Sequence, residues 1–116
     1  MTVTIYHNPR CSKSRQTLEL IREAGIEPEI VEYLKIGWTE ALLKDLFAKA
    51  EIPAREALRA KQAPAPELGL TKADDATILA AMITHPVLVE RPIVVVGNQA
   101  AICRPPERVS DLLDKG

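Results

Sequence analysis

The chain has 116 residues, a net charge of −1 and a hydrophobic content of 47%. This length fits a single domain, residues 1–116, with a mainly aliphatic core, since only 3% of the residues are aromatic. The balanced charge excludes broad electrostatic binding to nucleic acid or to a membrane surface, and no apolar stretch reaches the roughly 20 residues that span a bilayer.

The two cysteines, Cys11 and Cys103, bear on the compartment. The first six residues have no basic segment and lead directly into a strand-like pattern, so they predict no signal peptide. We therefore expect a cytoplasmic protein with reduced thiols. The sequence has no metal-ligand spacing and no dinucleotide glycine fingerprint, so we expect no bound metal, NAD or flavin. Without a heptad repeat or a large apolar excess, we expect a monomer.

The first third of the chain predicts a β-α-β unit. Residues 3–6 are rich in β-branched side chains and indicate a strand, and Asn8-Pro9 is a turn signal. The helix that follows is expected to end at Gly25, and residues 29–33 indicate a second strand. The inward positions of that helix are Leu18, Ile21 and Ala24.

The middle, about residues 39–84, predicts helices. Thr39 can N-cap the first of them, and a shorter helix can occupy residues 53–60, starting with a proline. Thr71 or Asp74 can open a third helix with an apolar stripe.

The last third predicts a β-hairpin and a helix. Residues 93–96 form a continuous apolar run, which is typical of a strand buried on both faces. Gly97-Asn98 is a hairpin turn signal, residues 100–103 can form the return strand, and Pro105-Pro106 can start a final helix. The whole order predicts an α/β fold, a thioredoxin-like mixed four-stranded sheet with flanking helices and a helical insert at about 39–84.

Cys11 is the first candidate for chemistry, because it lies between a predicted strand and a predicted helix. The first turn of a helix exposes unpaired N–H groups and the positive end of the dipole, which stabilise a thiolate. Arg10, Lys13 and Arg15 add positive charge, and an oxyanion could bind at the same place. The alternative is that Cys11 is a small apolar residue in a buried turn. For Cys103, with apolar neighbours, a structural role is favoured.

Three arginines are candidates for anion binding. Arg91 interrupts two apolar runs, Arg104 follows the last predicted strand, and Arg59 lies in the middle of the chain. A guanidinium is costly to bury without an anion, and its planar fork suits a tetrahedral oxyanion. Pro92 is a candidate for a cis peptide bond. The alternative is that the three arginines pair at the surface with Glu90, Glu107 or Glu56.

The segment His7-Asn8-Pro9-Arg10-Cys11-Ser12-Lys13-Ser14-Arg15 resembles the active-site loop of the glutaredoxin-coupled arsenate reductases. Further similar segments follow in order to the last helix, so the resemblance covers nearly the whole chain. They are Glu32-Tyr33-Leu34, Glu67-Leu68-Gly69-Leu70, His85-Pro86, Glu90-Arg91-Pro92-Ile93-Val94-Val95 and Cys103-Arg104-Pro105.

The resemblance implies a reaction and assigns residues to it. Cys11 would attack arsenate, glutathione would reduce the adduct as a co-substrate, and glutaredoxin would resolve the mixed disulfide and release arsenite. The oxyanion would bind Arg59, Arg91 and Arg104, and Pro92 would be the cis-proline of the fold. The groups expected to activate or position the thiolate are His7, Asn8, Ser14 and Arg15.

One departure from the reductase pattern keeps other functions open. Better-known arsenate reductases carry an Ala-Cys-Gly-Thr-Ser loop, whereas Arg10 and Lys13 here add charge to it. One alternative is therefore a reductase of glutathione mixed disulfides or another small thiol adduct. A less favoured one is a redox regulator that binds RNA polymerase. Many such regulators sense oxidation through a Cys-x-x-Cys pair, and Ser14 stands at the second cysteine position.

Overall fold

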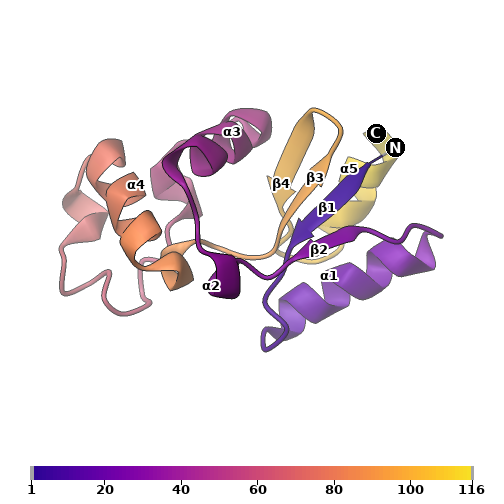
Figure 1. Ribbon diagram of the computed structural model, residues 1–116, viewed down its shortest axis with the longest axis horizontal. Helices are drawn as coiled ribbons and strands as arrows, with labels where there is room; N and C mark the ends of the chain where they lie inside the picture. The colour runs from indigo at the N-terminus through magenta and orange to yellow at the C-terminus, as the bar shows by residue number, and fades with distance from the viewer. Residues whose placement is uncertain (1, 116) are drawn as a thin grey trace. The chain divides into compact units, whose positions relative to one another are not determined.

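The computed structural model describes residues 2–115 and is drawn in Figure 1. Two compact units make up the chain. The first combines the residues up to Tyr33 with those from Arg91 onward, and the second is Leu34–Glu90. The predicted insert at about 39–84 falls inside the second unit.

The first unit contains a four-stranded mixed sheet, as the sequence predicts. Its strands are β1 (Val3–Tyr6), β2 (Glu29–Val31), β3 (Ile93–Val96) and β4 (Gln99–Ile102), in the order β2-β1-β3-β4. β1 pairs in parallel with β2 and antiparallel with β3, and β3 and β4 form the antiparallel hairpin. The parallel pair follows from the β-α-β crossover, and the antiparallel pair from the Gly97-Asn98 turn.

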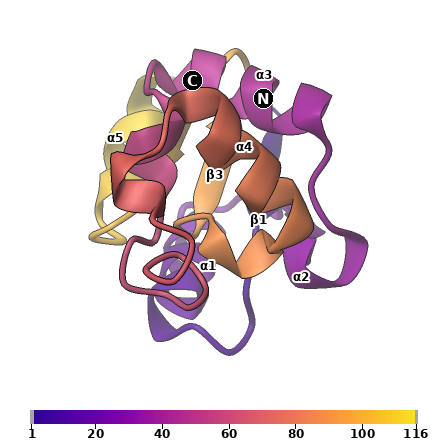
Figure 2. The ribbon, with the colours of Figure 1, turned by 90° about the vertical axis from the view of Figure 1, so that its left-hand side faces the viewer.

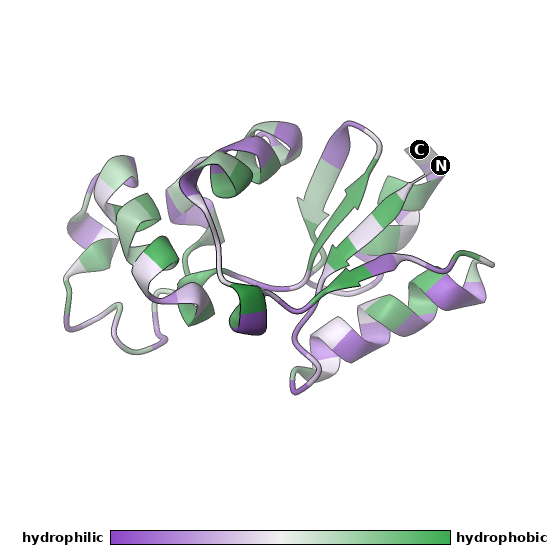
Figure 3. Cartoon of the chain, in the orientation of Figure 1, coloured by the Kyte–Doolittle hydropathy of each residue, from purple (hydrophilic) through white to green (hydrophobic). Residues whose placement is uncertain are grey.

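Two helices pack on one face of this sheet, α1 (Ser12–Glu23) and α5 (Arg108–Lys115). The register places Ile5 opposite Val94 and Val3 opposite Val96, so alternate side chains point to the same face. Figure 3 shows β3 as hydrophobic along its length. Each large apolar side chain buried here stabilises the fold by about 1.5–3 kcal/mol. The buried cluster comprises Val3, Ile5, Ile21, Val94, Val96, Cys103, Val109 and Leu112.

Helix α1 begins and ends at residues whose chemistry explains its limits. Cys11 is the N-cap, with an extended backbone at φ −92° and ψ 121°, and its carbonyl accepts the Arg15 N–H at 3.0 Å. Gly25 follows the helix with φ +83°, a left-handed conformation that favours glycine. Its N–H donates to the Arg22 carbonyl at 2.9 Å.

The second unit is helical, and Figure 2 looks onto α4 and the turn-rich segment that precedes it. Thr39 caps α3 (Glu40–Ala50), as the sequence predicts, by accepting the Leu42 N–H at 3.1 Å. Asp74, not Thr71, caps α4 (Asp75–Thr84) by accepting the Thr77 N–H at 2.8 Å. No helix within residues 2–115 is both long and apolar enough to cross a bilayer.

The predicted helix over residues 53–60 is wrong in extent. Only a short 3-10 helix, Ala54–Ala57, forms there. At Leu58 the chain becomes extended and makes an isolated antiparallel bridge with Val89, and the neighbouring Arg59 N–H donates to the Leu88 carbonyl at 2.8 Å. Pairing with a distant segment thus overrides the local helical preference.

Short elements complete the chain, and the sequence did not predict them as such. A four-residue helix, α2 (Tyr33–Ile36), begins where the second predicted strand was expected to continue. Two further 3-10 helices occupy Leu70–Lys72 and Pro86–Leu88.

Candidate active site

The loop between β1 and α1 is held as a fixed turn, and Asn8 makes two of the bonds that hold it. Its carbonyl accepts the Cys11 N–H and its Oδ1 accepts the Arg10 N–H, both at 3.0 Å. From the helix side, Arg15 reaches back and donates through Nη1 to the Pro9 carbonyl at 2.9 Å. The backbone on both sides of Cys11 is therefore fixed before any ligand binds.

The Cys11 thiol is half-buried at the N-terminus of α1. Burial alone would raise its pKa, but the Ser14 amide, the Arg91 charge and the Lys13 amide act in the opposite direction and prevail. The pKa of Cys11 therefore lies below its ordinary value. The side chain makes no capping hydrogen bond of standard geometry, so these amides act chiefly on the charged form.

Two buried polar side chains, His7 and Ser14, are hydrogen-bonded to each other beneath the β1–α1 loop. His7 is 6% exposed and Ser14 is fully buried, and His7 Nδ1 lies 2.6 Å from Ser14 Oγ. The same hydroxyl oxygen accepts the Asn8 N–H at 3.0 Å. These bonds link the end of β1 to the first turn of α1 and so fix where the helix starts.

The pKa of His7 is lowered by its surroundings. Burial lowers its pKa most strongly, the Glu32 carboxylate opposes this, and the charges of Arg22 and Arg15 lower it again. The result lies below the ordinary value of 6.5. This shift disfavours the charged form of His7, and its ring is hydrogen-bonded to Ser14.

Arg91 and Arg104 lie at one end of the β3–β4 hairpin. The register pairs Ile93 with Ile102, so the residue two before β3 and the residue two after β4 lie together. Arg104 Nη1 donates to the Arg91 carbonyl at 3.4 Å. Arg91 also lowers the pKa of Cys11 by charge and by a side-chain hydrogen bond, so it lies beside the thiol. The hairpin thus brings the Arg91 side chain to the helix N-terminus and holds Arg104 next to Arg91.

The Arg91–Pro92 peptide bond is cis, the isomer that the sequence suggested for Pro92. The Pro92 carbonyl accepts the Cys103 N–H at 2.9 Å, which ties this turn to the end of β4. Two further cis bonds, Ala63–Pro64 and Arg104–Pro105, were not expected from the sequence.

Arg59 belongs to the second unit. Its Nη1 donates to the Val87 carbonyl at 3.3 Å, and its Nε lies 3.8 Å from a carboxylate oxygen of Glu90. The surface alternative considered above named Glu90 as a partner, and this long contact corresponds to it. Its role in binding an oxyanion stays a prediction from the sequence.

The second cysteine is buried. Cys103 is fully enclosed in the core of the first unit. Burial raises the pKa of its thiol to about 12, although the Arg108 charge acts in the opposite direction. Cys103 is therefore a protonated, inaccessible thiol, in agreement with the structural role favoured from the sequence.

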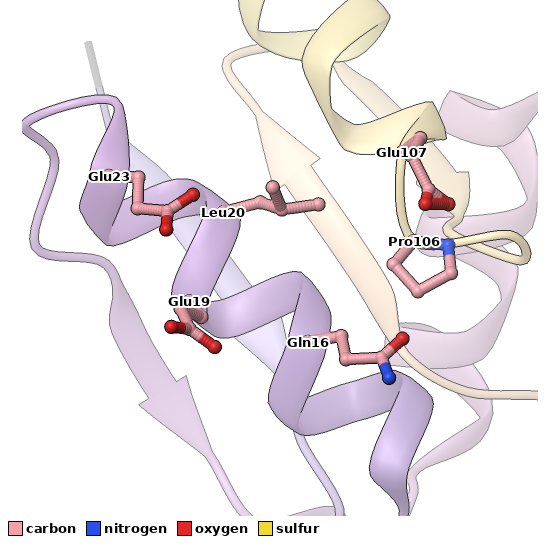
Figure 4. Close-up of a pocket in the computed structure, with 6 residues that line it drawn as sticks. All are labelled: Gln16, Glu19, Leu20, Glu23, Pro106 and Glu107. Atoms are coloured by element: carbon pink, nitrogen blue, oxygen red, sulfur yellow. The ribbon is translucent and has the colours of Figure 1, made fainter.

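A shallow groove of about 270 Å³ runs between α1 and the start of α5. Figure 4 shows the carboxylates of Glu19 and Glu23 on α1 and of Glu107 just before α5. Negative charge repels an oxyanion, so this groove is not a substrate site for one. Within residues 2–115, no group of three or more potential His, Cys, Asp or Glu ligands could hold a metal ion.

The strand-turn-helix with its thiol, the mixed sheet and the cis-proline turn define a thioredoxin-like α/β protein. A solved structure from Vibrio cholerae, an arsenate reductase, superposes with a TM-score of 0.91 at 43% identity, covering 96% of this chain and 97% of that one. The model of the ArsC family, a family of oxidoreductases, matches residues 6–112, and the chain belongs to this family.

Two relatives align with this chain along nearly its full length. An arsenate reductase of Rhizobium meliloti is 50% identical over 115 residues, covering 97% of this chain and 82% of its own length. The arsenate reductase ArsI2 of Synechocystis sp. is 49% identical over 114 residues, covering 97% of this chain and 81% of its own. The resemblance recognised in the sequence is confirmed.

The structure gathers most of the residues chosen from the sequence. Asn8 and Arg15 fix the loop, His7 and Ser14 lie buried beneath it, and Arg91 lies beside the thiol. Two contributors were missed, the Pro9 carbonyl that receives Arg15 and the Lys13 amide that faces the sulfur. The Asn-Pro turn signal and the first-turn position were the available hints.

Proposed function

We propose that this protein reduces arsenate to arsenite, with Cys11 as the nucleophile. The observation that carries the proposal is a half-buried thiol whose pKa is lowered by helix-turn amides and by Arg91. This is the environment that keeps a cysteine both nucleophilic and close to a bound anion. Relatives named arsenate reductase, at about half identity over nearly the full chain, support the choice of oxyanion.

In the first step, the Cys11 thiolate attacks the arsenic of bound arsenate. A sulfur–arsenic bond forms, and an arsenate oxygen takes up a proton and leaves as water. Arg91 and Arg104 hold the oxyanion and offset its charge as the anionic nucleophile approaches. This step transfers no electrons to arsenic, so a reductant must follow.

In the second step, glutathione supplies the missing thiol as a co-substrate. Its thiolate attacks the Cys11 sulfur, a disulfide forms, and the sulfur–arsenic electron pair stays on arsenic, which leaves as arsenite. Glutaredoxin then takes the glutathionyl group by thiol exchange and regenerates the Cys11 thiol. An external thiol is required because the other cysteine, Cys103, is buried and protonated.

The neighbouring residues take positioning roles in this proposal. Asn8 and Arg15 hold the loop backbone, and His7 with Ser14 fixes the first turn of α1 against β1. The cis bond at Pro92 shapes the turn that carries Arg91. Arg59 is retained as a further oxyanion ligand on the strength of the family resemblance alone.

The setting of the reaction follows from its reductants. Free thiols persist in a reducing compartment, so we assign the reaction to the cytoplasm and treat the enzyme as a monomer without a bound cofactor. Neither nucleic acid nor a membrane surface is a partner in this proposal.

A paired turnover assay tests the function. Arsenate with glutathione and glutaredoxin is compared with a glutathionylated peptide, and NADPH consumption is followed through glutathione reductase in both arms. The proposal requires arsenite to appear in the first arm and Cys11→Ser to abolish it. Turnover of the peptide alone would transfer the assignment to mixed-disulfide reduction.

A further inference from the structure

Two cations flank the reactive thiol without a partner of their own. Arg10 immediately precedes Cys11, and Lys13 is the second residue of α1. Both are exposed, and within residues 2–115 neither side chain takes part in a hydrogen bond or ion pair. Their backbones are fixed, since the Arg10 N–H is held by Asn8 and Lys13 lies in the helix, where its carbonyl accepts the Thr17 hydroxyl.

Several other cations of the same unit, unlike the exposed Arg108, have partners within the fold. Arg22 pairs with Glu27 at 3.0 Å, Arg15 donates to the Pro9 carbonyl, and Arg104 donates to the Arg91 carbonyl. Arg91 acts on the thiol itself. Arg10 and Lys13 differ because their charges are used neither to hold the loop nor to lower the pKa of Cys11.

We propose that Arg10 and Lys13 form a subsite for the carboxylates of an anionic thiol co-substrate of the glutathione class. The inference rests on the proposed function in one respect, that an external thiol attacks a covalent adduct on Cys11. The oxyanion is held by Arg91 and Arg104, whereas the incoming thiol approaches from solvent, where Arg10 and Lys13 extend. Arg91 and Arg104 therefore bind the oxyanion, whereas Arg10 and Lys13 bind the thiol co-substrate.

The net charge of a thiol co-substrate determines how strongly Arg10 and Lys13 attract it. Glutathione carries two carboxylates and one ammonium group, so its thiolate form has a net charge of −2 and is attracted by both cations. Residues directly beside Cys11 lie within about one Debye length, roughly 8 Å, of a thiol at its sulfur, so physiological salt leaves much of this attraction in place. A thiol with an ammonium group and no carboxylate has a thiolate form of net charge zero, so it gains little from the two cations.

The test isolates one thiol exchange and needs no arsenate. Cys11 is converted to its neutral thiopyridyl disulfide; buried Cys103 does not react under brief treatment. Stopped-flow absorbance then follows release of pyridine thione. The attacking thiolate forms a disulfide with the Cys11 sulfur, and the thione leaves with a proton. Glutathione, 2-mercaptoethanol and cysteamine are compared, because their attacking thiolate forms carry net charges of −2, −1 and 0.

The double variant Arg10→Ser, Lys13→Gln is compared with Arg108→Gln, which removes one exposed positive charge from the same unit. We expect the rate constant for glutathione to fall about 5- to 10-fold in the double variant, with about a 3-fold effect from each single change. The rate for 2-mercaptoethanol should fall about 2- to 3-fold, and that for cysteamine should change less than about 2-fold. Arg108→Gln should leave all three rates unchanged.

Three outcomes would overturn the inference. An equal fall for all three thiols would indicate an altered Cys11 environment, and an equal effect in Arg108→Gln would indicate net charge alone. In a third outcome, the double variant reacts with all three small thiols at unchanged rates but loses the glutathionyl group on Cys11 to glutaredoxin more slowly. That result would assign Arg10 and Lys13 to the binding of a protein partner. This assay contains no arsenate. The order of the three thiol rates can therefore agree with the inference even if the protein does not reduce arsenate, so the two proposals are tested separately.

Discussion

The two cysteines of the first unit carry the same functional group in opposite environments. Cys11 lies at a helix N-terminus, half-buried, with backbone amides and Arg91 facing its sulfur. Cys103 lies at the end of β4 among aliphatic side chains. The pKa of Cys11 falls below its ordinary value, whereas burial raises the pKa of Cys103 to about 12.

Burial acts on both sulfurs in the same direction, so it does not explain the difference. It raises the pKa of each thiol, and it is the largest single influence on each. Only at Cys11 do first-turn amides and a guanidinium together exceed it. The comparison shows that the pKa of a thiol here depends on compensating polar groups and not on exposure alone.

The largest expected effect comes from substituting the two cysteines one at a time. Cys11→Ser should reduce turnover at least about 10³-fold, because a hydroxyl is a far weaker nucleophile at neutral pH. Cys103→Ala should keep turnover within about 2-fold and cost on the order of 1 kcal/mol of unfolding free energy through the small cavity left. Steady-state kinetics and denaturant unfolding measure the two effects. A large loss of turnover in Cys103→Ala would make it a redox partner of Cys11.

A smaller effect should follow from removing the compensating charge. Arg91→Ala should raise the pKa of Cys11 and lower turnover about 10- to 100-fold, since the thiolate and the oxyanion lose the same cation. Arg91→Lys keeps the charge and should recover part of the pKa change but less of the turnover, because lysine lacks the planar fork. Iodoacetamide alkylation against pH gives the pKa. An unchanged Cys11 pKa in Arg91→Ala would show that Arg91 does not stabilise the thiolate.

The smallest effect concerns stability in alkali. A thiol whose pKa is raised in the folded state stabilises the fold below its unfolded pKa and loses that contribution as pH rises toward the folded value, about 12 for Cys103. Relative to Cys103→Ala, the unaltered protein should therefore lose on the order of 2 kcal/mol between pH 8 and pH 11. Urea unfolding across this range measures the difference. Parallel pH profiles for the two proteins would mean that Cys103 is not desolvated.

The sequence predicted those parts that depend on local patterns. The β-branched runs at 3–6 and 93–96 became β1 and β3, and the position of Cys11 between a strand and a helix predicted the lowering of its pKa. The helix expected at 53–60 failed because Leu58 pairs with Val89, a partner that no local pattern reveals.

The site shows the same limit. The anion-binding choice of Arg91 and Arg104 came from their charge beside prolines, but their closeness depends on the register of Ile93 with Ile102. The bond from Arg15 to the Pro9 carbonyl depends on a side-chain conformation. Neither the strand register nor the rotamer is encoded within a short window of sequence, so these details required the structure.

The most direct test of the account is the pH dependence of alkylation at the two thiols in one native sample, read site by site by mass spectrometry. Cys11 should react with a midpoint clearly below the ordinary thiol pKa, while Cys103 should stay unmodified until the protein unfolds. Equal reactivity of the two cysteines, or a Cys11 midpoint at or above that of a free thiol, would contradict this prediction.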